Sequence, residues 1–269
     1  ILRNVWCVNS ASSLVRLSCF RLTLTKSKAY KPRFYRELMG NERWKSCRVG
    51  YRETDLWVAV STDRYIPPVK EFLSERIKFY RSLLDEHIIK NPEFLTSLIP
   101  LLIPPGIHPL VNDMYKASEV AGTGPMSAVA GAVAEFICND LLAQFGSQEV
   151  VVENGGDIFM KLTQPVTISV YAGESPLSDK IGLIIKPEQT PLSVCCSSGT
   201  VGHSLSFGTA DACMIACRSG ALADAFATAG CNEVKGLEMV STVTELMLRK
   251  PDVISVVVIK DDIVGIGGT

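Results

Sequence analysis

Between residues 149 and 196 the chain runs through a succession of short, apolar, β-branched segments that no helical pattern interrupts. The segments cover residues 149–153, 158–162, 166–171, 181–185 and 192–196, and a further strand is expected near 205–217. Strands joined by short loops pair antiparallel, whereas a parallel, doubly wound sheet needs a crossover helix between successive strands. The pattern therefore predicts an α+β fold.

Helical patterns flank these strands on both sides. Apolar residues recur at three- and four-residue steps over 66–89, and a helix made mostly of small residues opens at 122–125 and runs to about 145. Prolines divide 93–121 into two short helical pieces, and two more helices are expected near 219–230 and 236–249. Earlier strands are expected at 33–39 and 55–61, and a final hairpin at 253–266 through Asp261-Asp262.

Composition limits the classes of protein to which this chain can belong. Its 269 residues are 47% hydrophobic and 20% charged, enough for one large domain or two small lobes and unlike disordered, collagenous or coiled-coil chains. No apolar run reaches the roughly 18–20 residues of a membrane span. The first 90 residues carry a net charge of +9 and the rest −10, and the overall pI of about 6.4 disfavours nucleic-acid binding.

Nine cysteines without the spacing of a zinc site or a disulfide framework are expected to be free thiols in a reducing cytoplasm. Residues 1–29 are predicted to be a poorly ordered extension, with a cleaved signal as the alternative, and residues 30–269 to be a single domain.

The first candidate motif is Gly122-Thr123-Gly124-Pro125-Met126-Ser127. Unpaired N–H groups and the positive end of the helix dipole at such a start favour an anion, for example a phosphate on Gly124 and Ser127. The alternative is that Gly-Pro only marks the beginning of a helix.

The second motif is Glu153-Asn154-Gly155-Gly156-Asp157. Paired glycines could bring backbone N–H groups close to a ligand, with Asp157 just beyond them. A plain hairpin turn with positive φ explains the same residues.

The third motif is Ser197-Ser198-Gly199-Thr200, followed by His203. Hydroxyl groups beside a glycine after a strand suit phosphate or carbonyl contacts. A single histidine is more often structural than catalytic, so this motif stays open.

The fourth motif is an alanine-rich helix in which Asp224 and Thr228 are four residues apart and share one face. A carboxylate and a hydroxyl are hard oxygen ligands that suit Mg²⁺ bound to substrate phosphates. The alternative is a packed helix with one exposed acid.

Taken in order, GTGPMSAVAGAVAEF, VVVENGGDI, SSGTVGH and ADAFATAG resemble the ApbE-like superfamily, whose best-known members are FAD:protein FMN transferases. YKPRFYREL, ETDLWV and HSLSFGTADA are similar to a bacterial and archaeal branch that lacks parts of the transferase motifs. The resemblance runs from about Tyr30 to the C-terminus.

The resemblance implies two mixed α/β lobes with FAD in the cleft between them and Mg²⁺ on its diphosphate. Asp224 and Thr228 match the metal-binding Asp and Thr of the transferases, and Asp224 and His203 would be the catalytic residues. The cofactor would contact Gly124, Ser127, Asn154, Gly155, Gly156, Asp157, Ser198 and Gly199. Implied partners are a flavin nucleotide and a protein acceptor of FMN, in a chain that can oligomerise.

Two departures bear on the reaction. The transferases carry a Lys where this chain has Ala128, and of their His-x-x-Asp-Pro-x-x-Gly stretch only His203 has a counterpart. An Mg²⁺-dependent enzyme that transfers FMN or cleaves the FAD diphosphate is therefore weighed against a non-catalytic dinucleotide-binding module. A third hypothesis is a catalytic cysteine at Cys195 or Cys196.

Overall fold

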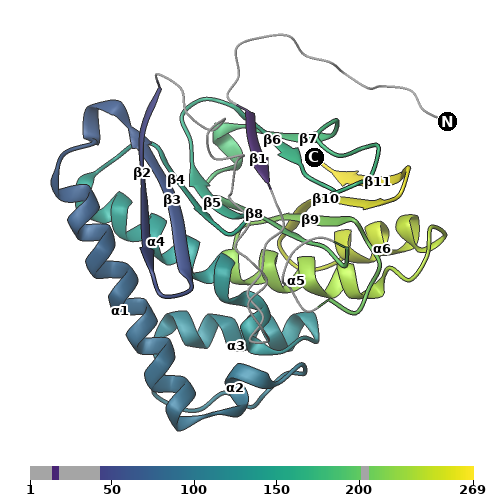
Figure 1. The fold of residues 1–269 in the computed structure, drawn as a ribbon, viewed down its shortest axis with the longest axis horizontal. Coiled ribbons are helices and arrows are strands. Elements are labelled where there is room, and N and C mark those ends of the chain that lie inside the picture. Colours follow the sequence, from purple (N-terminus) through teal and green to yellow (C-terminus); the bar gives the residue numbers. More distant parts are fainter. Residues whose placement is uncertain (1–13, 18–42, 201–205) are drawn as a thin grey trace.

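The computed structural model describes residues 14–17, 43–200 and 206–269 and is built around one large antiparallel sheet (Figure 1). The order of its strands is β11-β10-β9-β8-β5-β4-β3-β2. Their bounds are β2 (Trp44–Tyr51), β3 (Thr54–Ser61), β4 (Val150–Asn154), β5 (Asp157–Lys161), β8 (Leu192–Ser197), β9 (Ala212–Cys217), β10 (Val253–Lys260) and β11 (Ile263–Gly268). The α+β prediction is confirmed, because the large sheet is antiparallel and tight turns join β2 to β3, β4 to β5 and β10 to β11.

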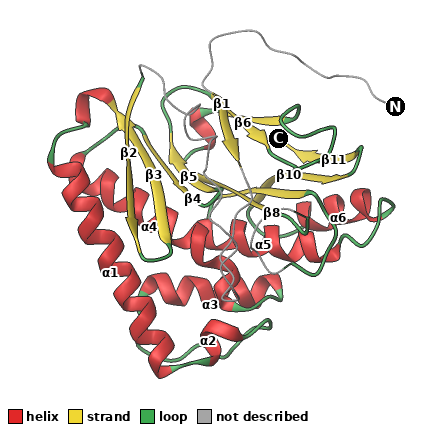
Figure 2. Ribbon diagram, viewed as in Figure 1, coloured by secondary structure: helices red, strands yellow, loops and turns green. Residues whose placement is uncertain are grey.

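Helices cover one face of this sheet in two groups (Figure 2). The first group, α1 (Pro68–Lys90), α3 (Pro109–Ala121) and α4 (Val129–Phe145), packs on side chains such as Val58, Val152 and Phe159. The second, α5 (Gly220–Glu233) and α6 (Met239–Leu248), packs on Ile215 and Val256. The helix α2 (Glu93–Thr96) and the 3₁₀ turns η2 (Thr62–Arg64), η3 (Pro125–Ala128) and η4 (Pro187–Gln189) connect the longer elements. The sheet is continuous beneath both groups.

The opposite face is covered by a small sheet of order β1-β6-β7, formed by β1 (Leu14–Leu17), β6 (Val166–Val170) and β7 (Gly182–Ile185). Ile168 and Val170 bury their side chains against Ile158 and Met160 of the large sheet. Strand β1 pairs parallel with β6. Strand β1 lies inside the segment 1–29 that we predicted to be an extension. The domain boundary between residues 29 and 30 therefore stays a prediction.

The expected strand near 205–217 begins only at Ala212. Residues before it are held against the end of α5 instead: Thr209 donates its N–H to the Val234 carbonyl, and a Cβ on Gly208 would lie 1.7 Å from the carbonyl oxygen of Cys231. The hairpin expected through Asp261-Asp262 is confirmed, with Lys260 opposite Ile263. The strand expected at 33–39 lies outside the described residues.

Within the part of the chain that is described, one helical stretch, Pro125–Phe145, is long and apolar enough to cross a membrane by length and composition alone. Its residues Gly131, Ala134, Ile137 and Cys138 are buried among the sheet and the neighbouring helices. A helix that is apolar on most sides is what burial in a core requires.

Candidate functional site

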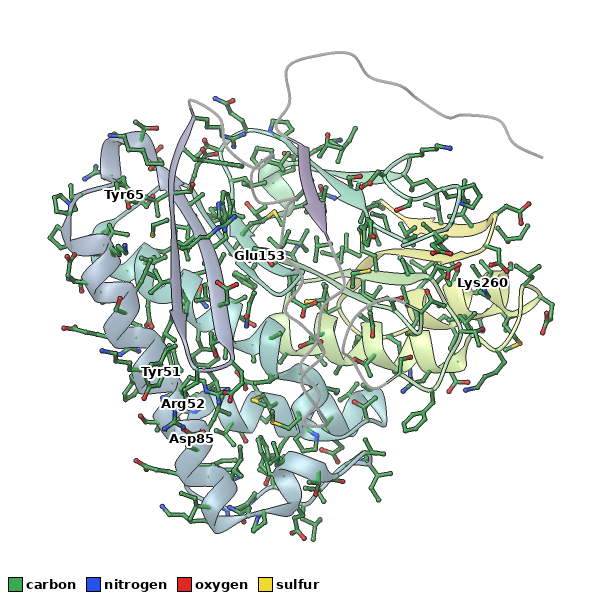
Figure 3. The ribbon with its side chains drawn as sticks, viewed as in Figure 1. Tyr51, Arg52, Tyr65, Asp85, Glu153 and Lys260 are labelled. Carbon is green, nitrogen blue, oxygen red and sulfur yellow. The ribbon has the colours of Figure 1, made fainter. Side chains whose placement is uncertain are left out.

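The turn between β4 and β5 is the two-residue hairpin that its Asn-Gly-Gly-Asp sequence predicts. Asn154 pairs with Asp157, and the intervening Gly155 and Gly156 have φ of 70° and 109°, which L side chains rarely adopt. The buried Glu153, near the centre of the molecule in Figure 3, accepts a 2.7 Å bond from the Gly156 N–H. The plain hairpin interpretation is therefore correct, and the functional one depends on what lies beside the turn.

The start of α4 lies beside this turn. The Asn154 side chain donates a 3.1 Å hydrogen bond to the carbonyl oxygen of Ala130, so the turn of the second motif contacts the helix that follows the first. The predicted helix from Gly124 begins as the 3₁₀ turn η3, and α4 proper starts at Val129. The N-cap residue Ala128 supplies no side-chain acceptor, so the first N–H groups of α4 need another partner.

That partner is Asp224 on α5. Its Oδ2 accepts the N–H groups of Ala130 at 3.0 Å and Gly131 at 3.1 Å. The first N–H groups of α4 are therefore stabilised by a carboxylate of the protein itself, whereas the anion expected at Gly124 and Ser127 stays a prediction. Asp224 is only 3% exposed and Thr228, one turn further on, 5%, so the interpretation of Asp224 as an exposed surface acid is wrong.

Gly124 and Ser127 have structural partners in this arrangement. A Cβ on Gly124 would lie 1.8 Å from the carbonyl oxygen of Ser97, so only glycine allows that approach. The hydroxyl groups of Ser127 and Thr123 are 2.6 Å apart. Their predicted contact with a cofactor stays a prediction.

The third motif continues from the end of β8 and is joined to the same turn. Asp157 Oδ1 accepts the N–H of Cys196 at 3.2 Å, and Gly199 donates its N–H to the Ala210 carbonyl at 2.9 Å. Ser198 is 1% exposed. The structure therefore brings Asn154–Asp157, Asp224 and the β8 end together, whereas His203 lies outside the described residues.

Most cysteines among the described residues are buried free thiols. Seven are free, and six of these are buried. Burial, reinforced by the negative charges of Asp157 and Asp224, raises the pKa of the Cys195 thiol well above its ordinary value. A thiol held in its neutral form is a poor nucleophile, which argues against Cys195 as a catalytic cysteine.

Sequence reasoning missed two groups at this site. Glu153 could have been found as an acid inside an otherwise apolar strand, directly before the paired glycines. Gly131 of α4 and Gly220 of α5 stand among the small residues of their helices, but nothing in the sequence marks them as a pair, although a Cβ on Gly131 would lie 2.1 Å from the Gly220 carbonyl oxygen. Helix glycines that permit such contact are visible only once the two helices are placed together.

Comparison with known proteins gives consistent family matches. The family model described as AbpE bacteria matches residues 36–251. A UPF0280 protein of Methanocaldococcus jannaschii is 38% identical over 232 residues, covering 84% of this chain and 91% of its own. A UPF0280 protein of Methanopyrus kandleri is 35% identical over 229 residues, covering 83% and 90%.

Solved structures with the same fold include flavin transferases. The apo flavinyl transferase ApbE of Pseudomonas stutzeri superposes with a TM-score of 0.55 at 14% identity, covering 83% of this chain and 94% of its own. A variant of flavin transferase ApbE from Vibrio cholerae gives 0.53 at 13% identity, covering 83% and 97%. At such identities the likeness shows a shared fold.

Proposed function

This chain belongs to the AbpE bacteria family within the ApbE-like superfamily, and on that premise we propose that it binds FAD and, with Mg²⁺, cleaves the FAD diphosphate. In transfer, an acceptor hydroxyl of a protein attacks the FMN phosphorus, the bond to the bridging oxygen breaks, and AMP leaves. With water as the acceptor, the products are FMN and AMP. The site of action would be the reducing cytoplasm, where the free thiols of this chain are stable.

The observation that carries the proposal is the convergence of three motifs at one point. The Asn154–Asp157 turn contacts the start of α4 through Ala130, and the same start is bonded to Asp224. A glycine turn that lets a ligand approach the backbone, next to a buried carboxylate that can meet a cation, suits a nucleotide diphosphate with its metal. Ser198-Gly199 adds a hydroxyl next to the turn.

The residues also fit the divalent cation. Asp224 and Thr228 present two buried hard-oxygen groups one helical turn apart. Glu153, Asp157 and Asp224 bring negative charge close to where an anionic diphosphate would bind. Mg²⁺ bound there would neutralise negative charge on the FAD diphosphate and on the AMP that leaves.

One observation favours the second candidate, a module that binds FAD without cleaving it. Ala128, which stands where the transferases carry Lys, is fully buried in the core beneath α4. The chain therefore has no cation at that position, and chemistry that depends on one would be lost while binding is retained.

Release of AMP separates the two candidates. Purified protein incubated with FAD and Mg²⁺ should release AMP, as measured by chromatography, and chelation of the metal should stop it. Binding without release would support the module.

Neither candidate survives if no flavin or adenine nucleotide binds. At a hundredfold excess over Kd, FAD should add about 2.7 kcal/mol to the free energy of unfolding, which a rise in Tm would report.

A further inference from the structure

Two helices of the proposed site cap one another. Asp224 of α5 accepts the N–H groups of Ala130 and Gly131 at the start of α4. In return, Oε2 of Glu135 on α4 accepts the N–H of Gly220, the first residue of α5, at 2.7 Å. Each carboxylate therefore stabilises the positive end of the other helix.

These three bonds accompany a backbone-to-backbone contact between the two helices. A Cβ on Gly131 would lie 2.1 Å from the Gly220 carbonyl oxygen and 2.9 Å from Cβ of Asp224. A Cβ on Gly220 would lie 2.3 Å from the Gly131 carbonyl oxygen and 3.1 Å from Cβ of Glu135. With only backbone between the helices at this crossing, the carboxylate bonds join the start of each helix directly to the other.

Glu135 is not needed to cap α5 in the ordinary way. The N-cap Ser219 already accepts the N–H of Leu222 at 3.4 Å. Glu135 instead bonds the N–H of Gly220, the residue in contact with α4. Its contribution is therefore to the position of α5, and through α5 to Asp224, four residues further along the helix.

We propose that Glu135 is a positioning residue that holds the Asp224 carboxylate at the start of α4, beside the Asn154–Asp157 turn. The inference deepens the proposed function, because Asp224 is there the group that would bind the metal and nucleotide. Loss of the Glu135 bond would free the first turn of α5 and lengthen the bonds from Ala130 and Gly131 to Asp224. Residues that orient a metal ligand typically change metal affinity by about tenfold or more.

The test compares E135A, which removes the acceptor, with E135Q, which keeps an amide oxygen in the same place. D140A is the matched control: Asp140 is also on α4 and partly buried, but bonds Arg76 at 2.7 Å and Tyr80 at 2.6 Å on the side facing α1. Amide hydrogen exchange is measured by NMR at Ala130 and Gly131 in the ligand-free protein. Each rate is taken relative to Ile137 and Cys138 in the same helix, so that a general loss of stability cancels.

In E135A the relative exchange at Ala130 and Gly131 should rise about tenfold or more, while E135Q and D140A should resemble the wild type. The gain in FAD affinity on adding Mg²⁺ should fall by a similar factor in E135A alone. Unchanged relative exchange in E135A, or an equal rise in D140A, would overturn the inference. If wild-type protein shows no Mg²⁺-dependent FAD binding, the proposed function fails, and the exchange result alone still decides whether Glu135 holds Asp224.

Discussion

Strand β4 has a buried carboxylate at each end, and the two are stabilised by different donors. Before its first residue, Glu149 accepts bonds from Nε of Arg43 at 2.7 Å, the Trp44 indole at 3.0 Å and the Thr163 N–H at 2.6 Å. At its far end, Glu153 accepts the N–H of Gly156, and Asp157 beyond the turn accepts that of Cys196.

The difference separates a structural joint from a candidate site. The guanidinium of Arg43 neutralises Glu149, and its bond joins the start of β2 to the start of β4 and the loop after β5. At the far end, Glu153 and Asp157 accept backbone N–H groups, so these carboxylates fix the shape of the turn and join it to β8. The function of a buried carboxylate therefore depends on whether its hydrogen-bond donor is a charged side chain or a backbone N–H group.

The largest effect is expected where the helices of the candidate site cross. G131A places a Cβ 2.1 Å from the Gly220 carbonyl oxygen, and neither backbone can move away easily. We expect a loss of about 3 kcal/mol or more in the free energy of unfolding, measured by urea denaturation. The control G50A meets only Thr54 at 3.4 Å and should cost less than about 1 kcal/mol. Equal losses would mean that the crossing is not tight.

At the structural end, E149Q should cost about 2–3 kcal/mol at pH 7 and leave FAD binding unchanged. Burial alone would raise the pKa of Glu149, but bonds from Arg43, Thr163 and Trp44 outweigh it and lower the pKa from 4.5 to about 2. A lowered pKa stabilises the fold above pH 4.5, and this contribution is lost as the pH falls towards 2. Stability measured from pH 7 to pH 2 should therefore fall more steeply in the wild type than in E149Q. Parallel curves would exclude this role.

A smaller effect on stability but a clear one on binding is expected from G155A in the turn. Gly155 has φ of 70° and Gly146, after the last residue of α4, has φ of 58°, so alanine is strained at either position. Both G155A and G146A should lose about 1 kcal/mol in thermal or urea unfolding. Only G155A should also weaken FAD binding in a calorimetric titration. Equal FAD affinity in the two variants would remove the turn from the site.

The parts of the fold that depend on local chemistry were predictable. Paired glycines after Asn154 require positive φ, and this gives the β4–β5 hairpin. Alternating and helical patterns gave α1 and most strands of the large sheet. The candidate site was predicted from four motifs taken together in their order along the chain. No single one of these motifs would have been enough to predict it.

Contacts between distant residues were not predictable in the same way. Glu135 and Gly220 are 85 positions apart, and Arg43 and Glu149 are 106 apart. Nothing near Asp224 in the sequence indicates that its acceptor oxygen faces the N–H groups of another helix. Such pairs depend on how helices and strands pack in three dimensions, and the local pattern of apolar and polar residues does not specify that packing.

The most direct test of the central claim, that Asp224 serves a nucleotide and its metal, is a calorimetric titration of FAD into wild-type and D224N protein with and without Mg²⁺. The variant keeps the shape of the side chain and an oxygen for the N–H groups of Ala130 and Gly131, so the fold should be retained. We expect the wild type to bind FAD more tightly with Mg²⁺, and D224N to lose about 1–3 kcal/mol of that Mg²⁺-dependent binding free energy. Equal affinity in all four titrations would contradict the assignment of Asp224 to the metal and, with it, the proposed catalytic function.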